Sequence, residues 1–288
     1  MDGDENIKLK KTYLFNDAVA GVIEALLLVA LFSIVLSTVQ LVYIPDIMEQ
    51  REVEHMDEVE NQFSYLKSII DLQSSLKQNI TISCPLTLGS RELPYLVTVR
   101  AFGQIDIIDM GESKINTDSV SNIPLTSVKY QASNSYFLKQ EYILEGGGLI
   151  IKQHDGESMR IEPSMNYQNE SGNIKIFWSL PEFDGLSGKN STSGFKSCYI
   201  RCNYSSNEDL APATNYTYIY TEYLDAWNNS LNQLFEEPIQ NNYMTIEKKP
   251  ISDPTYVEIK EGTTGSIEIY IMKTKIMMQI GPGIVIQS

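Results

Sequence analysis

The chain has 288 residues, of which 42% are hydrophobic and 20% charged, and its formal net charge is −15. Of these charges, 19 of 22 bases and 32 of 37 acids follow Ile44, so that part alone carries −13. A surface this negative repels nucleic acids and anionic lipid headgroups, which excludes DNA or RNA binding. The 244 residues after Ile44 suffice for one large or two small domains.

A long apolar run near the N-terminus predicts a membrane helix. It covers 27 residues, 18–44, and Glu24 is the one charged residue in it. A membrane span needs about 20 such residues, whereas the apolar core of a cleaved signal peptide has about 7–15. The run also lacks the small-residue cleavage site of a signal peptide. Such a length is unusual for the buried helix of a soluble protein, so we expect the helix to stay attached as an anchor.

The flanking charges predict the orientation of this helix. Lys8, Lys10 and Lys11 precede it, whereas the thirty residues after it contain Arg51 and Lys67 as their only bases. The positive-inside rule places residues 1–17 in the cytoplasm and the rest of the chain outside. Six Asn-x-Ser/Thr sequons, which are possible N-glycosylation sites, also follow the apolar run and fit an exported glycoprotein: Asn79, Asn169, Asn190, Asn203, Asn215 and Asn228.

Residues 45–78 form an amphipathic pattern that predicts an extension of the helix. A stripe of apolar residues recurs every three or four positions, and charged residues occupy the other face: Met56, Val59, Phe63, Leu66 and Ile70. The stripe could form a coiled-coil seam between chains or lie on the chain's own β domain. Because it covers only about three heptads, we expect the second arrangement.

After Gln78 the sequence changes to short segments in which apolar and polar residues alternate. Strands are expected within 95–109, 135–156, 172–180, 196–204, 215–224, 255–262 and 266–281. Leu224, Trp227, Leu231, Leu234 and Phe235 recur at helical spacing and predict one short inserted helix. The fold class is therefore α+β: a long N-terminal helix followed by a mainly antiparallel, sandwich-like exterior domain over 79–288.

Three cysteines leave several interpretations open. Cys198 and Cys202 could close a small disulfide loop, with Cys84 buried as a small hydrophobe, or all three could be thiols. A zinc site would need histidine ligands, but His55 and His154 have no suitable spacing relative to the cysteines. We expect neither a metal nor a cofactor.

The sequence shows no pattern typical of an active site. His154 stands in a Gln-His-Asp-Gly stretch that predicts a solvated hairpin tip, and His55 lies in the charged proximal helix. The segment "EGGG" at 145–148 lacks the Lys-Ser/Thr of a P-loop and predicts a bulge or turn. We therefore expect that the protein is not an enzyme.

The N-terminal segment "KKTYLFNDAVAGVIEALLLVALFSIVL" resembles the N-termini of archaeal type IV pilin-like proteins. The blocks "LGSRELPYLVTVRAFGQIDII", "SYFLKQEYILEGGGLIIKQ" and "YTEYLDAWNNSL" also resemble exterior domains of uncharacterised pilin-like proteins of methanogens. The resemblance implies an assembly helix that begins at Ala18, Val19, Ala20, Gly21, Val22 and Ile23. It also implies processing by a prepilin-type peptidase. Ala20 stands where these N-termini often carry Ser, and Glu24 where they often carry Gly.

Glu24 has two interpretations. Pilins generally carry a Glu five residues from the mature N-terminus, which would make Ala20 the first residue here and Val19 the residue before the cut. Val19 is larger than the residue that the peptidase favours. The carboxylate of Glu24 could neutralise the terminal amine of a neighbouring subunit and set the register of assembly, or it could lie at the cytoplasmic headgroup level, where a charge costs little.

Two classes of function follow from these patterns. The first is a pilin-like cell-surface protein, structural or adhesive, that is anchored through residues 18–44 and self-associates or joins other pilin-like subunits in a filament. The second is a permanently anchored extracytoplasmic receptor, or a minor pilin-like component of an envelope machine. Both place the N-terminus in the cytoplasm and the β domain outside the cell.

Overall fold

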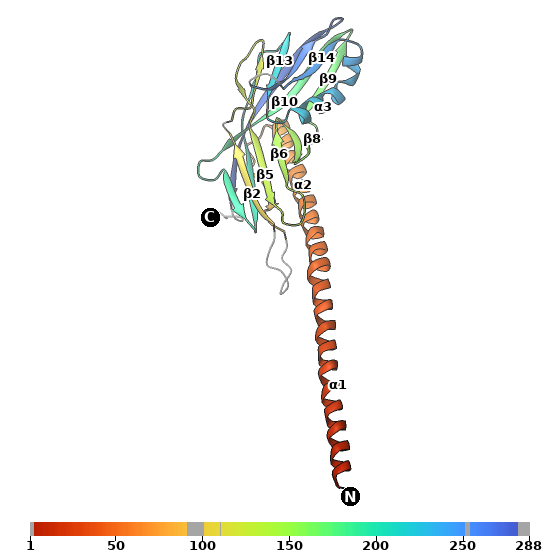
Figure 1. Cartoon of the computed structure of the whole chain (residues 1–288). Helices are drawn as coiled ribbons and strands as arrows, with labels where there is room; N and C mark the ends of the chain where they lie inside the picture. Colours follow the sequence, from red (N-terminus) through yellow and green to blue (C-terminus); the bar gives the residue numbers. More distant parts are fainter. Residues whose placement is uncertain (1–2, 91–100, 110, 251–253, 282–288) are drawn as a thin grey trace, which may run out of the picture. The chain divides into compact units, whose positions relative to one another are not determined.

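The computed structural model describes residues 3–90, 101–109, 111–250 and 254–281, with side chains from Ala20 onward. The described chain divides into a helical unit, which extends to Gln50, and a β unit, which begins at Arg51. Figure 1 shows the long N-terminal helix in red to orange and the strands in yellow to blue. The expected strand segment 95–100 lies outside the described residues.

The N-terminal part of the chain is helical from Gly3. Helix α1 spans Gly3–Thr38, the π-helix η1 spans Val39–Tyr43, and α2 spans Ile44–Leu76. The N–H of Ile44 donates to the carbonyl of Val39, five residues earlier. Pro45 follows at once, and because it has no N–H it is tolerated only in the first turn of a helix. The sequence predicted the helix and its junction at Pro45, but it did not predict the π turn or a helical start within residues 1–17.

Three sheets build the β unit. The first has the order β1 (Ile82–Thr87), β12 (Ser197–Asp209), β16 (Ser266–Gly281), β10 (Asn173–Gly185) and β9 (Met165–Glu170). The second has the order β11 (Ser191–Gly194), β2 (Phe102–Ile108), β5 (Ser127–Ser133), β6 (Gln140–Glu145), β7 (Gly148–Gln153) and β8 (Gly156–Ile161). The third has the order β14 (Met244–Lys249), β15 (Tyr256–Glu261), β13 (Tyr216–Tyr220), β3 (Lys114–Thr117) and β4 (Ile123–Pro124).

The strand pairing is antiparallel except between β10 and β16, which pair in parallel from Asn173↔Ser266 to Gly185↔Met278. These strands are also among the longest, with 13 and 16 residues. Alternation of apolar and polar residues predicted both strands, but it does not encode which strands become neighbours. A parallel pair needs a long crossover connection, and here the chain from β11 to β15 supplies it.

Two hydrophobic clusters form the core of the β unit. The first cluster contains the α2 stripe together with side chains of β1, β2, β5, β6, β12 and the C-terminal half of β16. The second cluster contains side chains of β10, β13, β14, β15, the N-terminal half of β16 and α3 (Leu224–Leu234). Along β16 the buried positions change from Ile267, Ile269 and Ile271 to Thr274, Ile276 and Met278. Because side chains alternate between faces, this change of phase buries opposite faces of one strand in the two clusters.

Two helices, not one, lie between β13 and β14, where every residue is described. Helix α3 buries Trp227 and Leu231, and the five-residue helix α4 (Glu236–Gln240) follows it. The "EGGG" segment forms a two-residue turn, since Glu145 pairs with Gly148. Gly146 and Gly147 have φ of 59° and 86°, which favours glycine at both positions.

Candidate membrane anchor and helix–domain junction

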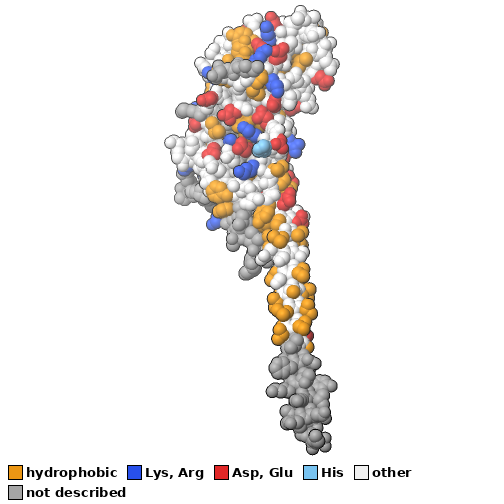
Figure 2. All heavy atoms as spheres, in the orientation of Figure 1, with side chains coloured by type: hydrophobic (Ala, Val, Ile, Leu, Met, Phe, Trp, Pro, Cys, Tyr) orange, Lys and Arg blue, Asp and Glu red, His pale blue; other side chains and the backbone are white. Residues whose placement is uncertain are grey.

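The helical unit presents a continuous apolar surface. From Val22 to Tyr43 its large hydrophobic side chains are 53–77% exposed, except that of the half-buried Val39, and Figure 2 shows hydrophobic side chains as orange spheres along the helix. Among the described residues, one helical stretch, Ala20–Leu76, is long and apolar enough to cross a membrane. Water alone would disfavour so many exposed Leu, Val and Ile side chains, so this surface is a candidate membrane anchor.

Two hydroxyl side chains in this helix form hydrogen bonds to the helix backbone. The Ser33 hydroxyl donates to the Val29 carbonyl at 2.8 Å, and the Thr38 hydroxyl to the Ile34 carbonyl at 2.9 Å. Hydroxyls bonded in this way can enter hydrocarbon without an unpaired donor. Glu24 lies on the exposed helix surface with Ala20, Gly21, Val22 and Ile23. The side chains of Ala18 and Val19 lie outside the described residues, and the assembly role of all seven stays a prediction.

Within the β unit, helix α2 lies in the first hydrophobic cluster rather than at a seam between chains. Met56, Val59, Phe63, Leu66 and Ile70 are each at most 1% exposed. The Phe63 ring stacks on Tyr142 of β6 with ring centroids 6.0 Å apart, and it lies 6.4 Å from the ring of Tyr130 on β5. The structure therefore shows the stripe packed on the chain's own β domain, and a coiled-coil seam through these buried residues is wrong.

Glu52 joins α2 to the loop between β5 and β6. Its carboxylate is fully buried and accepts three backbone hydrogen bonds, from the N–H groups of Ser135 at 3.0 Å, Tyr136 at 2.7 Å and Phe137 at 2.7 Å. Successive N–H groups that converge on one carboxylate form a nest for an anion. Here the anion is part of the chain, so Glu52 fixes the loop to the helix.

His55 and Tyr130 form a second buried polar contact of α2. The Tyr130 hydroxyl donates to the Leu88 carbonyl at 2.7 Å, and the His55 Nε2 lies 3.0 Å from the same hydroxyl. Burial lowers the pKa of His55, although Glu58 and Glu52 oppose that change. His55 is therefore a buried residue on the core face of the charged proximal helix, where it hydrogen-bonds Tyr130.

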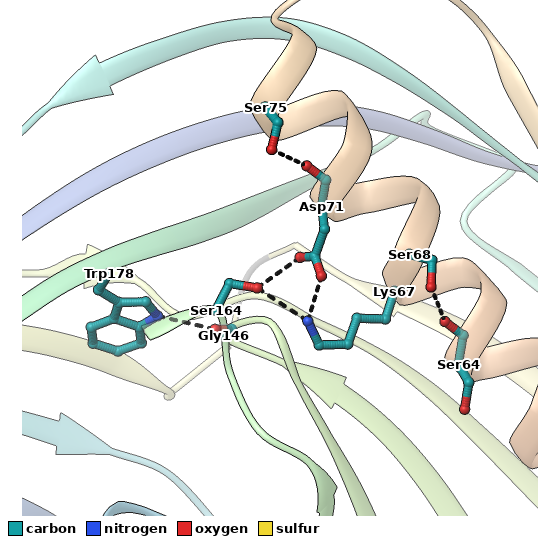
Figure 3. Close-up of polar contacts among 8 residues, drawn as sticks. All are labelled: Ser64, Lys67, Ser68, Asp71, Ser75, Gly146, Ser164 and Trp178. Atoms are coloured by element: carbon teal, nitrogen blue, oxygen red, sulfur yellow. Dashed lines mark hydrogen bonds and ion pairs between the residues drawn. The ribbon is translucent and has the colours of Figure 1, made fainter. Parts of the chain in front are cut away.

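Figure 3 shows a third junction, formed by Lys67, Asp71 and Ser164. Lys67 Nζ lies 2.6 Å from Asp71 Oδ2 and donates to Ser164 Oγ at 3.1 Å, while Ser164 Oγ donates to Asp71 Oδ1 at 2.8 Å. The Ser164 carbonyl also accepts the N–H of Ser179 on β10 at 3.0 Å. The group therefore clamps α2 to the strand β10.

Gln73 closes the far end of the junction. Its Nε2 donates to the carbonyls of Ile80 at 2.9 Å and Cys202 at 2.8 Å. The predictions from the sequence did not include Glu52, Asp71, Gln73 or Ser164, and they gave Lys67 only as one of two bases that follow the apolar run. The spacing in the sequence nevertheless marks two of these residues as candidates for buried contacts. Glu52 stands four residues before Met56 and Lys67 four residues after Phe63, so both lie next to the apolar stripe. A charged residue at the edge of a buried helix stripe often has a buried partner.

Of the two alternatives for Cys198 and Cys202, the structure contradicts the disulfide and shows thiols. Both residues are free thiols on strand β12, four positions apart. A strand rises about 3.3 Å per residue, so their Cα atoms lie about 13 Å apart, beyond the roughly 7 Å limit of a disulfide. Cys84 on β1 pairs with Ile200, between them, and is also a buried free thiol.

The other candidate residues are spread over the surface. Asn79, Asn169 and Asn215 are exposed, whereas Asn190, Asn203 and Asn228 are half-buried; their glycosylation stays a prediction. His154 is exposed at the β7–β8 turn and lies 2.8 Å from Asp155. Over the ranges that the structure describes, no three His, Cys, Asp or Glu side chains form a metal-binding group.

Comparison with known proteins adds no family to this geometry. No protein-family model matches the chain, and neither the curated proteins nor the solved structures contain a match.

Proposed function

We propose that the chain is a membrane-anchored, pilin-like cell-surface protein, whose apolar helix holds the β domain at the membrane and can pack with other copies in a filament. The observation that carries this proposal is the exposed apolar surface from Val22 to Tyr43. A helix with this surface needs hydrocarbon or other apolar helices around it, because water solvates it poorly.

The junction of α2 supports a mechanical role for the β unit. Its apolar stripe lies in the core, and the contacts of Glu52, Lys67 and Gln73 attach it to three separate parts of the β unit. A force on α2 would therefore act on the whole β core and not on one hinge. This is the property that a surface subunit or an adhesive protein needs.

Charges support an outward orientation. Lys8, Lys10 and Lys11 precede the apolar run, and the acidic part of the chain with all six sequons follows it. Under the positive-inside rule the β domain would lie outside the cell. Protease treatment of intact cells that carry the native protein tests this orientation: cleavage of the β domain without lysis supports it, and protection until lysis contradicts it.

The N-terminal residue of the native protein separates a filament subunit from a fixed anchor. Terminal-peptide mass spectrometry should find a start near residues 18–21 if a peptidase removes the leader, and electron microscopy of the same cells should then find filaments that antibodies to the β domain label. A start at Met1 or Asp2, without labelled filaments, would contradict the filament role and leave a permanently anchored surface protein.

A further inference from the structure

A shallow hollow of about 490 Å³ lies on the second sheet, across β2, β5, β6 and β7. It is on the face opposite the first hydrophobic cluster. Register places Gln104, Gln131, Glu141 and Lys152 in one row across the four strands. Their neighbours in sequence, Ile105, Tyr130, Tyr142 and Ile151, point the other way into the core. The size falls within the range of about 300–1,000 Å³ that is typical of ligand pockets.

Amide groups dominate the polar lining of this hollow. Gln104 and Gln153 are exposed and Gln131 is half-buried. Gln104 Nε2 donates to Asp106 Oδ2 at 2.8 Å, so one of its donors is used. Each glutamine still offers a carbonyl acceptor and N–H donors toward the hollow. A ligand that satisfies them must both donate and accept hydrogen bonds, as hydroxyl groups do.

Charges in the lining add a preference for an anion. Lys139 is exposed at the rim, and Lys152 Nζ lies 5.3 Å from the centre of the Tyr223 ring, over its face. Glu141 is the acid of the lining, and Lys129 already lies 2.9 Å from its carboxylate. Lys152 also pairs in register with Glu157 of β8, so Lys139 is the lysine of the lining with which an anionic group of a ligand would pair.

An aromatic ring completes the lining. Phe102 is 39% exposed, and its ring meets that of Phe195 edge to face, with centroids 5.2 Å apart. Neither ring is part of the two core clusters. An exposed phenyl ring beside amides offers an apolar contact to one side of a ligand whose other side forms hydrogen bonds.

We propose that this hollow binds an acidic saccharide, a sugar chain with carboxylate groups. Its hydroxyls pair with the glutamine amides, a carboxylate pairs with Lys139, and the C–H face of a sugar ring lies on Phe102. The inference rests on the proposed function in one respect, because the β domain must face the outside of the cell to meet such a polymer. It gives the adhesive role a chemical class of ligand.

The amides favour a saccharide over an acidic peptide. Carboxylate side chains of a peptide only accept hydrogen bonds, so a peptide offers the carbonyl oxygens of Gln104, Gln131 and Gln153 only its backbone N–H groups, whereas a saccharide offers a hydroxyl on most ring carbons. A glutamine oxygen that the ligand covers loses its water, so a ligand that brings it no donor binds more weakly. An acidic peptide, or an acidic segment of a second copy of this chain, is therefore the competing occupant that the experiment must reject.

The test measures binding of the full chain in detergent micelles to three probes by calorimetry: an oligogalacturonate, a neutral galactose oligomer of equal length, and polyglutamate. We expect the oligogalacturonate to bind most tightly. Lys139→Gln, Gln153→Ala and Phe102→Ala should each weaken its binding about threefold to tenfold, because each removes one contact, and this fold-change corresponds to about 0.7–1.4 kcal/mol. Lys260→Gln, an exposed lysine of β15 in the third sheet, is the matched control and should change nothing.

These substitutions replace exposed side chains, so the fold should be retained, and circular dichroism of each variant checks this. Equal binding of polyglutamate would overturn the proposal in favour of a simple anion surface. The proposal would also be overturned if oligogalacturonate did not bind, or if all three variants bound it as tightly as the wild type. None of these results depends on the N-terminus or on filaments, so failure here is distinguishable from failure of the proposed function.

Discussion

The indole N–H of Trp227 donates to Glu145 Oε1 over 2.9 Å, in the interior of the β unit. The same carboxylate oxygen accepts the Thr221 hydroxyl at 2.7 Å, and Glu145 is 1% exposed. Glu145 ends β6, Thr221 follows β13, and Trp227 lies on α3. One buried carboxylate at the end of β6 therefore holds two residues that lie more than 70 positions further along the chain.

This carboxylate predicts a pH-dependent stability. Burial raises the pKa of Glu145 to about 7, although Thr221 and Trp227 oppose the rise, and Glu222 and Glu157 add to it. The folded state binds the proton of Glu145 more tightly than the unfolded state does. The protonated carboxyl therefore adds to the free energy of unfolding, fully below about pH 4.5, and this stabilisation is lost as pH rises through 7. A shift of this size corresponds to about 3 kcal/mol.

Glu145→Gln tests the assignment, since glutamine keeps an acceptor for Trp227 and Thr221 but has no charge. Urea unfolding of the full chain in detergent, monitored by tryptophan fluorescence, measures the free energy of unfolding. Between pH 5 and 8 this free energy should fall more for the wild type than for the variant. Both tryptophans of the chain lie at this site, with their rings 5.8 Å apart, so the signal reports on it directly. Glu261→Gln, an exposed glutamate, is the control. Parallel pH profiles of wild type and Glu145→Gln would contradict the prediction.

Glu52 predicts a large loss from a single substitution. Glu52→Ala leaves three backbone N–H groups of the β5–β6 loop without their acceptor, so we expect a destabilisation of about 3–5 kcal/mol. The loop at 134–139 should also become more sensitive to limited proteolysis. Glu54→Ala, two positions along the same helix and exposed, should cost less than about 0.5 kcal/mol. Equal effects of the two substitutions would show that the nest does not stabilise the loop.

The Lys67–Asp71 pair predicts an asymmetric double-mutant cycle. The Lys67 side chain is 9% exposed and that of Asp71 is 41% exposed. Asp71→Asn strands a mostly buried cation and should cost about 2–3 kcal/mol, a value reduced from that of a fully buried pair because water reaches Asp71. Lys67→Met leaves a carboxylate that water can solvate and should cost about 1 kcal/mol. The double variant should be more stable than Asp71→Asn alone; additive losses would rule out the coupling.

The cysteines predict slow reaction with alkylating reagents. Burial raises the pKa of Cys84 to about 12 and of Cys198 to about 11, and it raises that of Cys202 further. The native chain should therefore react slowly, since the thiolate is the nucleophile. After unfolding without a reductant, intact-mass analysis should find three modified thiols. A single modified thiol would instead reveal a disulfide.

Local pattern was sufficient for several elements of this protein. The length of the apolar run predicted the anchor helix, the spacing of Met56 to Ile70 predicted a buried helix face, and alternation predicted strands β10, β12, β13, β15 and β16. Each of these depends on neighbours within a few positions, because helix and strand periodicities are local properties of the chain.

Contacts between distant segments were decided only by the tertiary structure. The parallel pairing of β10 with β16 joins residues about 90 positions apart, and so do the contacts of Lys67 and Asp71 with Ser164. The burial of opposite faces along β16 also depends on these distant neighbours. The separation of Cys198 from Cys202 also depended on their place in one extended strand rather than a loop. The sequence by itself determined which residues must leave water. The free energy of packing the whole chain determined which partners these residues contact. Burial is favourable against any apolar surface, so only shape and hydrogen bonding select among the possible partners.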